Sequence, residues 1–338
     1  MKKTNSLSTF RRDYSTLVAT IYTKDQINNT FLSKIARINR LYLYLINCRW
    51  KSFSSQSFTC LAIIKDGIGY IGYLEGITPE DYHQAVLIGK DWLASHNIVE
   101  IYLPVDISLW DHHRLVSPDT ASGNTIGGTF YLEPANQDFY VNEFRSCGLR
   151  NYELRDCKKV ATYFTAYRQN YKYIVESLSK KVHSDGYQEF SIQETHKSLL
   201  QLKIIYKVYQ LSRRLFSGHQ GFYDIGFLAF VFARGFLDTD QTKQQLYCIF
   251  HNTKVIGFYT SQMSMIDTKK SYIIKTIVID PDFQKRGLTS LVIHHSHNLA
   301  QKIHADRVYY ATVKSDNTVS KMDRENLIMG SEYELYSI

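Results

Sequence analysis

The chain has 338 residues, a length that favours two domains over one. Its 17 Gly and 5 Pro against 26 Tyr and 18 Phe exclude collagen-like, linker-like and disordered chains. The 40 Lys and Arg exceed the 32 Asp and Glu, and the resulting net charge of +8 by itself assigns no partner.

The apolar segments of the chain are short. The richest, residues 226–236, is broken by Arg234 and falls well below the roughly 18 residues that cross a bilayer. An amino-terminal run at 17–22 is too short and too polar for the core of a signal peptide. We therefore expect a soluble, cytoplasmic protein with no membrane partner.

The cysteines indicate neither a disulfide framework nor a zinc site. They are odd in number, far apart and without a Cys-x-x-Cys pair: Cys48, Cys60, Cys147, Cys157 and Cys248. Such usage is typical of reduced thiols in a cytoplasmic protein, and we expect no metal.

The first half of the chain predicts a hairpin, a helix, a strand, a second helix and a second strand. Lys65-Asp66-Gly67 forms the turn of the hairpin between two apolar runs. Thr78 and Pro79 provide an N-cap and a first helical residue, and two acids follow in the first turn. In chain order these elements span residues 58–74, 79–95, 99–103, 136–147 and 152–164, with a further short strand near 128–132.

The second half repeats this succession of elements. A polar, turn-forming stretch at residues 180–186 predicts a boundary between two domains, 1–180 and 181–338. The elements after it are predicted at 187–192, 193–216, 222–236, 246–263, 272–279, 287–303, 307–313, 317–327 and 333–336. The expected fold class is α/β (α+β), with two domains that are each a mixed sheet with flanking helices.

One motif carries chemistry, and it runs from a buried strand through a tight loop into a helix at residues 277–289. A loop that opens a helix directs free backbone amides and the positive end of the helix dipole at one point. Gly287 leaves room for a phosphate beside them, and Lys285 and Arg286 add positive charge. The motif therefore predicts a diphosphate site, with a strand edge beside it along which an extended ligand could pair.

This motif resembles the diphosphate-binding signature of the GNAT superfamily of acyl-CoA-dependent N-acyltransferases, Gln/Arg-x-x-Gly-x-Gly/Ala. Gln284, Gly287 and Thr289 occupy its three defined positions, and Thr289 departs from the usual Gly or Ala. The resemblance covers residues 246–338 well and the first half faintly. It implies a tandem arrangement of two GNAT-like domains in which the C-terminal domain binds acyl-CoA.

The first half carries no such loop. At the corresponding place, residues 75–81, acids and a proline replace the Gln, the basic pair and the glycine, and their charge would repel a diphosphate. We expect the first domain to be a degenerate GNAT-like domain without a CoA loop. Members of the superfamily usually end in two strands where this chain predicts one, so we expect a strand from elsewhere in the chain to complete the second sheet.

The resemblance implies acetyl-CoA, or another acyl-CoA, as co-substrate, and an amine of a small molecule or an amino terminus as acceptor. The pantetheine arm would enter between the strands 272–279 and 307–313, and the thioester carbonyl would meet backbone amides of the first strand. The residues implied in binding are Ile277, Val278, Ile279, Gln284, Lys285, Arg286, Gly287, Leu288, Thr289, Asn317 and Ser320. Asn317 can equally be the plain N-cap of the helix that it begins.

The groups that move protons in many members of the superfamily are missing from this chain. The fourth-strand Glu has no equivalent on the strand 272–279, and the Tyr expected seven residues after Asn317 is Arg324. Tyr333 and Tyr336 on the last strand are the candidates for the catalytic acid, although in a chain so rich in tyrosine a structural role competes. A proton path through water or through the substrate itself is the alternative.

Two other functions stay open on the sequence. A Fem-type aminoacyl transferase that uses aminoacyl-tRNA has a similar length and tandem domains, yet the basic residues here are spread out, so we expect no nucleic-acid partner. A non-catalytic CoA-binding sensor or scaffold would explain the missing Glu and Tyr. His294 and His297 are three residues apart, but no Glu or Cys accompanies them at a ligand spacing, and we expect a solvated helix face there.

Overall fold

The structure of the chain is a computed structural model. It describes residues 2–4, 6–22, 34–35, 38–39, 41–42, 45, 48–106, 114–117, 136, 139–150, 157–184, 187–195, 201–219, 222, 224–235, 244–266, 268–315 and 327–338, with the backbone alone at 2–4, 146–150, 183–184, 232–235 and 312. The chain divides into two compact units. Unit 1 comprises Met1–Tyr163, His219–Ile225 and Ser331–Ile338, and unit 2 comprises Phe164–Gly218 and Gly226–Gly330.

These units differ from the predicted domains 1–180 and 181–338. The polar stretch at 180–186 is largely the last turn of helix α5 (Lys172–Ser184). Ile174, Leu178 and Val182 recur every four residues along this helix and pack into the core of unit 2. The polar outer face of a helix gives the same local signal as a linker, which explains why the sequence alone suggests a boundary here.

The sheet of unit 1 has the strand order β1-β2-β3-β4-β5-β13-β7, and β6 also pairs with β13. Its strands are β1 (Lys2–Thr4), β2 (Arg49–Ser54), β3 (Phe58–Lys65), β4 (Ile68–Gly76), β5 (Ile101–Leu103), β6 (Leu115–Val116), β7 (Lys158–Arg168) and β13 (Ile328–Ser337). β4 and β5 run parallel, whereas β13 is antiparallel to β5. The sheet of unit 1 is therefore mixed.

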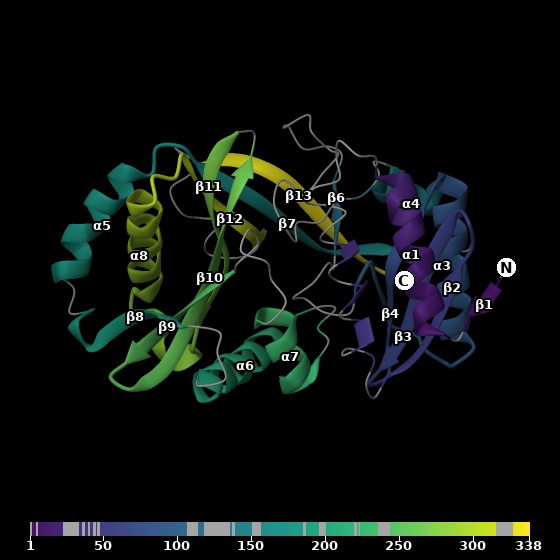
Figure 1. The fold of residues 1–338 in the computed structure, drawn as a ribbon, viewed down its shortest axis with the longest axis horizontal. Coiled ribbons are helices and arrows are strands. Elements are labelled where there is room, and N and C mark those ends of the chain that lie inside the picture. The colour runs from purple at the N-terminus through teal and green to yellow at the C-terminus, as the bar shows by residue number, and fades with distance from the viewer. Residues whose placement is uncertain are drawn as a thin grey trace. The chain divides into compact units, whose positions relative to one another are not determined.

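Helices cover both faces of this sheet (Figure 1). α3 (Pro79–Ala94) packs on β3 and β4, and α4 (Phe139–Arg150) lies beside it over the main apolar core of the unit. On the other face α1 (Leu7–Ile21) packs Phe10 against Tyr73 of β4, with ring centroids 6.4 Å apart. The predicted hairpin and the predicted helix at 79–95 are confirmed, with Thr78 as the N-cap.

The sheet of unit 2 has the strand order β13-β7-β12-β11-β10-β9-β8. Its remaining strands are β8 (Phe190–Thr195), β9 (Gln245–His251), β10 (Lys254–Ile266), β11 (Lys269–Ile279) and β12 (Arg307–Lys314). β8 to β11 pair in an antiparallel manner, and β12 runs parallel to β11. The predicted fold class, mixed sheets flanked by helices, is confirmed.

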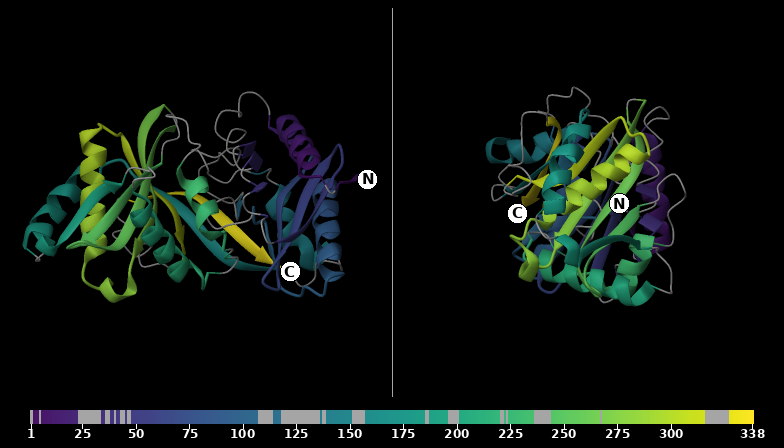
Figure 2. Two further views of the ribbon diagram at one scale, coloured as in Figure 1. Left: turned by 60° about the horizontal axis from the view of Figure 1, so that its bottom comes forward. Right: turned by 90° about the vertical axis from the view of Figure 1, so that its left-hand side faces the viewer.

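The helices of unit 2 lie in two layers (Figure 1 and Figure 2). α5 packs beside α8 (Leu288–Lys302), and α8 covers β11 and β12. α6 (Leu202–Phe216) packs on β10 and β11, and α7 (Gly226–Gly235) packs against α6. The helix predicted at 193–216 begins only at Leu202, because the first residues of that range belong to β8.

Two strands contribute to both sheets. β7 begins in unit 1 and ends in unit 2, whereas β13 begins in unit 2 and ends in unit 1. In unit 2, β7 lies between β12 and β13, so the expectation that a strand from elsewhere completes the second sheet is confirmed. Without β7, the strand β12 would leave its backbone groups unpaired at a sheet edge.

Several predicted elements lie outside the described residues or are shifted. The strand predicted at 152–164 is found at Lys158–Arg168, and the helix predicted at 136–147 is found at Phe139–Arg150. The strand near 128–132 and the helix at 317–327 fall on residues that the structure does not describe. None of the helices in the described part of the chain is long and apolar enough to cross a membrane.

Candidate functional site

The parallel strands β11 and β12 are paired over only part of their length. The register joins Ser271–Ile274 to Arg307–Tyr310, whereas β11 continues to Ile279 and β12 to Lys314. Among the described residues no pairing between these continuing segments is found. The side chains of 271–274 are buried and those of 275–277 are half-buried, so the strand becomes accessible where the pairing ends. β11 therefore presents a free backbone edge towards β12.

A β-bulge coincides with this separation. On the other side of β11, Thr260 pairs with Thr276 and Ser261 pairs with Ile274, so Lys275 is an extra residue in the ladder. A bulge bends its strand and increases the local twist. The bulge at Lys275 thus accounts for the departure of β11 from β12.

The loop after β11 is held in place by local hydrogen bonds. The backbone amide of Asp280 donates to Ile256 at 2.7 Å, and the Asp280 carboxylate accepts from the amide of Asp282 at 3.2 Å. The side-chain amide of Gln284 donates to the carbonyl of Ile279 at 3.0 Å, which ties the end of the loop to the end of the strand. Gln284 is therefore a residue that shapes the loop.

The start of α8 offers a row of free backbone amides. Gly287 is the N-cap, with φ 75°, and it supplies no side-chain cap. Within the described part of the chain, the backbone amides of residues 285–289 have no acceptor, whereas that of Ser290 donates to the carbonyl of Gly287 at 2.8 Å. Amides at a helix start bind anions because the helix dipole is positive there. This geometry fits the diphosphate predicted from the motif.

Positive side chains surround this helix start. Lys285 and Arg286 are exposed, and the guanidinium of Arg286 lies 5.1 Å from the centre of the Phe283 ring. Lys254, at the β9–β10 turn, lies 5.4 Å from the same ring. Arg214 of α6 pairs with the buried Asp280 at 3.3 Å. The charge of Asp280 is thus offset by a neighbour, and the loop keeps a positive surface.

Position 287 is crowded, contrary to the expected open space. A Cβ atom added to Gly287 would lie 2.1 Å from the hydroxyl oxygen of Tyr187, a buried residue just before β8. The sequence prediction explained Gly287 by room for a phosphate, whereas the structure adds a packing reason within the protein. Tyr187 was missed because it lies about a hundred residues away in the chain, and no spacing pattern links the two positions.

The equivalent region of unit 1 is built differently. The first turn of α3 is closed by a capping box, in which the amide of Asp81 donates to the Thr78 hydroxyl at 3.2 Å and the amide of Thr78 donates back to the Asp81 carboxylate. The amide of Val105 donates to the carbonyl of Ile71 at 2.9 Å, which continues the contact between β4 and the segment after β5. Unit 1 therefore satisfies internally the groups that unit 2 leaves free.

A buried acid also lies at this place in unit 1. Glu75, at the end of β4, is 1% exposed and forms a salt bridge with Lys34. Its carboxylate accepts from the hydroxyls of Tyr22 and Tyr140 at 3.1 and 3.0 Å. A satisfied carboxylate here is structural, and its negative charge is of the wrong sign for a diphosphate.

The predicted site residues fall into three groups. Ile277, Val278 and Ile279 lie on the free part of β11, and residues 284–289 follow within the same unit, so the structure brings these together. Asn317 and Ser320 lie outside the described residues. Tyr333 and Tyr336 belong to unit 1, not to the unit that holds the loop.

The two tyrosines proposed as catalytic acids are buried in their own surroundings. Tyr333 is 0% exposed and lies under the guanidinium of Arg114, 5.5 Å from the ring centre. The hydroxyl of Tyr336 donates to Glu334, and burial together with this carboxylate raises the pKa of Tyr336. These contacts give both tyrosines structural partners, and their catalytic role stays a prediction.

The histidines of α8 do not form the solvated face that was expected. His297 is 0% exposed, with Nδ1 bonded to the carbonyl of Ile293 at 2.7 Å and Nε2 bonded to the hydroxyl of Tyr310 at 2.8 Å. His295 is half-buried and bonded to the hydroxyl of Tyr259 at 2.7 Å. Burial lowers the pKa of each to about 4, so both are neutral at neutral pH. The expectation of a solvated face was wrong because spacing alone does not reveal which side of a helix is covered.

Comparisons with known proteins agree with this geometry. Residues 205–321 match the model of the Acetyltransferase (GNAT) family, and no curated protein matches the chain in sequence. A tandem GNAT protein from the clavulanic acid biosynthesis pathway has a similar structure, with a TM-score of 0.56, 8% identity, and coverage of 98% of this chain and 94% of that one. A GCN5-related N-acetyltransferase from Anabaena variabilis aligns with a TM-score of 0.54 and 10% identity, over 100% of this chain and 71% of its own.

A third solved structure is the glucosamine N-acetyltransferase region of a fungal multi-domain β-N-acetylglucosaminidase, with a TM-score of 0.52 and 10% identity over 99% of this chain and 37% of its own. At such identities these likenesses concern the fold alone, which is that of tandem GNAT proteins. Taken with the family match to residues 205–321, they show that the chain has the fold of tandem GNAT proteins and that its C-terminal half contains a segment similar to the Acetyltransferase (GNAT) family.

Proposed function

We propose that the protein transfers an acyl group, most simply acetyl, from acyl-CoA to an amine of a small molecule or an amino terminus. The observation that carries this proposal is the row of free amides at residues 285–289, directly beyond the free edge of β11. The match of residues 205–321 to the GNAT family model and the tandem GNAT fold support acyltransferase activity, and the acceptor and the acyl chain are our inference.

Each half of the donor has a place in this arrangement. The amides of residues 285–289, with the charges of Lys285 and Arg286, would hold the diphosphate. The free edge of β11 would pair with the amide groups of the pantetheine arm, as an added strand does. Backbone amides of 277–279 would then polarise the thioester carbonyl and stabilise the oxyanion that forms on it.

The chemistry is a direct attack. The amine nitrogen forms a bond to the thioester carbon, the carbon–sulfur bond breaks, and the thiolate leaves and takes up a proton. Strands β9 to β12 contain no Asp or Glu, so no carboxylate on these four strands accepts the proton of the attacking amine. We infer that the amine reacts in its neutral form and that, once the new bond has formed, water carries away the proton that the nitrogen loses.

The test is a thiol-release assay with acetyl-CoA and a panel of amines, alongside calorimetric measurement of CoA binding. Thr289→Glu places a carboxylate among the free amides, where it suits the helix dipole but repels a diphosphate. We expect CoA affinity to fall by about tenfold or more, a change of about 1.4 kcal/mol, without loss of stability. Thr289→Gln is the matched neutral control. CoA binding by Thr289→Glu equal to that of the parent would show that the diphosphate lies elsewhere.

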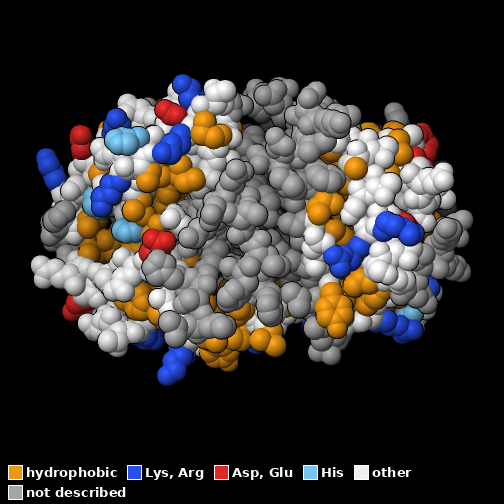
Figure 3. Space-filling view, viewed as in Figure 1, with side chains coloured by type: hydrophobic (Ala, Val, Ile, Leu, Met, Phe, Trp, Pro, Cys, Tyr) orange, Lys and Arg blue, Asp and Glu red, His pale blue; other side chains and the backbone are white. Residues whose placement is uncertain are grey.

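The same assay decides between the proposed enzyme and a CoA-binding sensor. The lack of a carboxylate on strands β9 to β12 is the observation that favours a sensor. A sensor binds CoA but releases no thiol in response to any amine. The third possibility, an aminoacyl-tRNA-dependent transferase, requires an extended basic surface. Figure 3 shows Lys and Arg side chains of the described residues scattered over the visible face, which lends this possibility no support there. Filter binding of aminoacyl-tRNA tests it.

The proposed setting is the cytoplasm. Two cysteines of the described residues, Cys60 and Cys248, are buried free thiols. Burial raises the pKa of Cys248 to about 11, which keeps that thiol protonated and unreactive. Free thiols support a reducing compartment, in which acyl-CoA is also the available donor.

A further inference from the structure

Helix α6 of unit 2 carries a buried hydroxyl that the fold does not use. Ser212 is 1% exposed, and within the described part of the chain its Oγ has no hydrogen-bond partner. The hydroxyl does not bond back to the carbonyl of Val208, one turn earlier, as the hydroxyls of helical serines often do. Because a buried hydroxyl without a partner destabilises a protein, Ser212 is not explained by the stability of α6.

Ser212 faces the sheet, close to the end of β11. It is buried together with Val208 on the same side of α6, and α6 packs on β10 and β11. Two residues further along the helix, Arg214 pairs at 3.3 Å with Asp280, the residue directly after β11. This ion pair holds the C-terminal part of α6 beside the end of β11, and Ser212 belongs to that part of the helix.

The face of the sheet under α6 carries polar side chains. Tyr259 and Met263 of β10 pack into the core on the α8 side. Since side chains alternate along a strand, Thr260 and Gln262 point to the opposite face, where α6 lies, and both are buried. Thr276 of β11 pairs with Thr260 and is half-buried. The layer between α6 and the sheet is therefore partly polar.

This polar layer lies beside the strand segment to which we assign the thioester. Ile274 is the last residue of β11 that pairs with β12, and Thr276 follows within the free part of the strand. The backbone amides that would polarise the thioester carbonyl, those of 277–279, come directly after Thr276. An amine that approaches from the α6 side would thus meet the thioester next to polar side chains.

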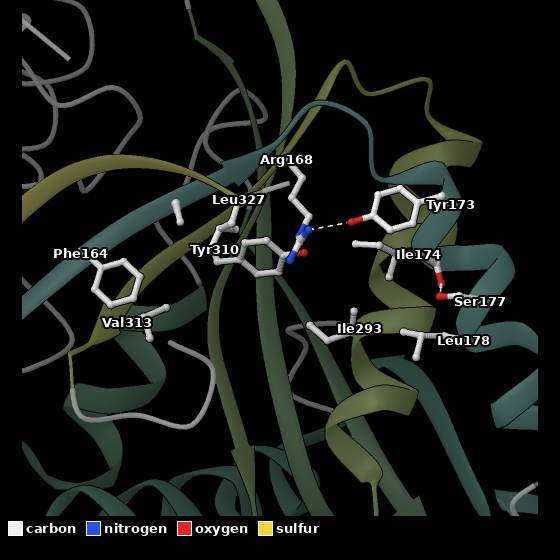
Figure 4. A pocket seen from close by; sticks show the side chains of 11 residues that line it. Phe164, Arg168, Tyr173, Ile174, Ser177, Leu178, Ile293, Tyr310, Val313 and Leu327 are labelled. Carbon is white, nitrogen blue, oxygen red and sulfur yellow. Dashed lines mark hydrogen bonds between the residues drawn. The ribbon is translucent and has the colours of Figure 1, made fainter. Parts of the chain in front are cut away.

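The α8 side of the same sheet offers less to a polar acceptor. Ile274 of β11 packs there into the apolar core. A cavity of about 300 Å³ on that side is lined by described residues that are mostly apolar, and none of them belongs to β11 (Figure 4). An attacking amine must lose a proton, which requires polar surroundings, so we place its approach on the α6 side.

We propose that Ser212 positions the water that accepts the proton of the attacking amine. This inference rests on the proposed acyl transfer and assigns a residue to its proton step. The amine nitrogen bonds to the thioester carbon and the carbon–sulfur bond breaks. The proton that the nitrogen loses passes to the water on Ser212 and from there to solvent, and the thiolate takes up a proton from solvent. Buried waters bind to polar groups that lack another partner, which is the state of the Ser212 hydroxyl.

Steady-state kinetics of the full chain test this role, with acetyl-CoA and the amine that gives the fastest thiol release. Ser212→Ala removes the hydroxyl, and Ser212→Cys keeps the size of the side chain but is a weak hydrogen-bonding group. We expect kcat to fall by about tenfold or more in both variants, at unchanged CoA affinity in calorimetry. The solvent deuterium isotope effect on kcat should rise, because proton transfer then limits the rate more strongly.

The matched control is Ser217→Ala, which removes an exposed hydroxyl from the end of the same helix and should leave kcat as in the parent. Urea denaturation separates the proposed role from a structural one. Loss of a hydroxyl without a partner should leave the urea midpoint of Ser212→Ala unchanged or raise it. A lower midpoint accompanying the lower kcat would show that the hydroxyl supports the fold, and it would overturn the proposal.

The outcomes also distinguish this inference from the proposed function. If the parent releases no thiol with any amine, the acyl transfer itself is wrong and the role of Ser212 falls with it. If the parent is active and Ser212→Ala has the same kcat and the same isotope effect, the acyl transfer stands and only the role of Ser212 is wrong.

Discussion

Gly287 is restricted to glycine by two separate features of the structure. Its φ of 75° is left-handed, which costs other residues roughly 1–2 kcal/mol, and its missing Cβ leaves the space that the Tyr187 hydroxyl fills. A position in a ligand-binding loop can therefore be constrained by packing as much as by the ligand.

We predict that Gly287→Ala lowers the free energy of unfolding by about 2–3 kcal/mol, through the backbone strain and the contact with Tyr187. Removing the hydroxyl in the double variant Tyr187→Phe/Gly287→Ala should recover about 1 kcal/mol of this loss, while the backbone term persists. Chemical denaturation of the parent, both single variants and the double variant gives the coupling directly. Strictly additive losses would show that Tyr187 does not restrict position 287.

His297 makes the stability of unit 2 sensitive to acid. Burial lowers its folded pKa to about 4, below the ordinary value of 6.5, so the unfolded chain binds the proton more strongly. The contribution of His297 to stability is therefore complete above about pH 6.5 and is lost as the pH falls through the range from 6.5 to 4, by roughly 3 kcal/mol. His295, whose pKa is also lowered to about 4, adds a decline over the same range.

We predict that His297→Gln lowers stability at pH 7, because the bonds to Ile293 and Tyr310 are weakened, but flattens the decline between pH 6.5 and 4. Urea denaturation at several pH values measures both effects. The exposed Gln301 on the same helix provides the control Gln301→Ala, which removes no titratable group, so its pH dependence should follow that of the parent. An unchanged slope in His297→Gln would assign the acid sensitivity to other groups.

At the scale of elements, the bulge in β11 and the uncapped start of α8 act together. The extra residue Lys275 ends the pairing of β11 with β12, and Gly287 starts α8 without a side-chain cap. The backbone edge of β11 and the first amides of α8 are therefore free one after the other along the chain. In unit 1 the capping box of Thr78 and Asp81 closes the helix start. The two units share elements but differ in which backbone groups stay free, and for this reason we assign the diphosphate of the proposed function to unit 2.

The composition of these strands predicts the pH profile of the reaction. Since β9 to β12 carry no Asp or Glu, the rate should follow the neutral fraction of the acceptor amine. We expect kcat/KM to rise about tenfold per pH unit up to the pKa of that amine. For two acceptor amines with different pKa values, the inflections in the two pH profiles of kcat/KM should therefore differ by the difference between those pKa values. One inflection common to both amines would reveal a base on the protein.

At the scale of the whole molecule, the C-terminal residues of the chain belong to unit 1. Residues 331–338 complete unit 1 although their neighbours along the chain belong to unit 2. Tyr333 and Leu335 are 0% exposed, and the buried Glu334 accepts hydrogen bonds from Arg145 at 2.6 Å and Lys159 at 3.2 Å. Unit 1 thus depends on the last eight residues for part of its core and for a buried ion cluster.

We predict that truncation after Gly330 unfolds unit 1, since losing several buried side chains at about 2–5 kcal/mol each exceeds the stability of an ordinary domain. The described tryptophans Trp50 and Trp92 belong to unit 1, so tryptophan fluorescence and near-ultraviolet circular dichroism report on it. Removing Ile338 alone is the control and should leave these signals in place. Native tryptophan signals after the long truncation would contradict the assignment of β13 to this core.

The sequence by itself determined many of the local elements and the loop to which we assign a diphosphate. The hairpin of unit 1 follows from the Asp66-Gly67 turn, and α3 follows from Thr78 and Pro79, because turns and caps depend on residues a few positions apart. The same holds for Gln284 to Thr289, whose spacing alone indicated free amides beside a glycine. The mixed α/β class followed from the order of such elements.

Only the tertiary structure decided which distant segments meet. Contacts across long stretches of chain determine the shared strands β7 and β13, the position of the Tyr187 hydroxyl over Gly287 and the burial of His297. Periodicity shows which side of an element is apolar, but it does not show which partner covers that side. For this reason the sequence located the loop to which we assign CoA, while the three-dimensional arrangement alone showed the free edge of β11 beside it.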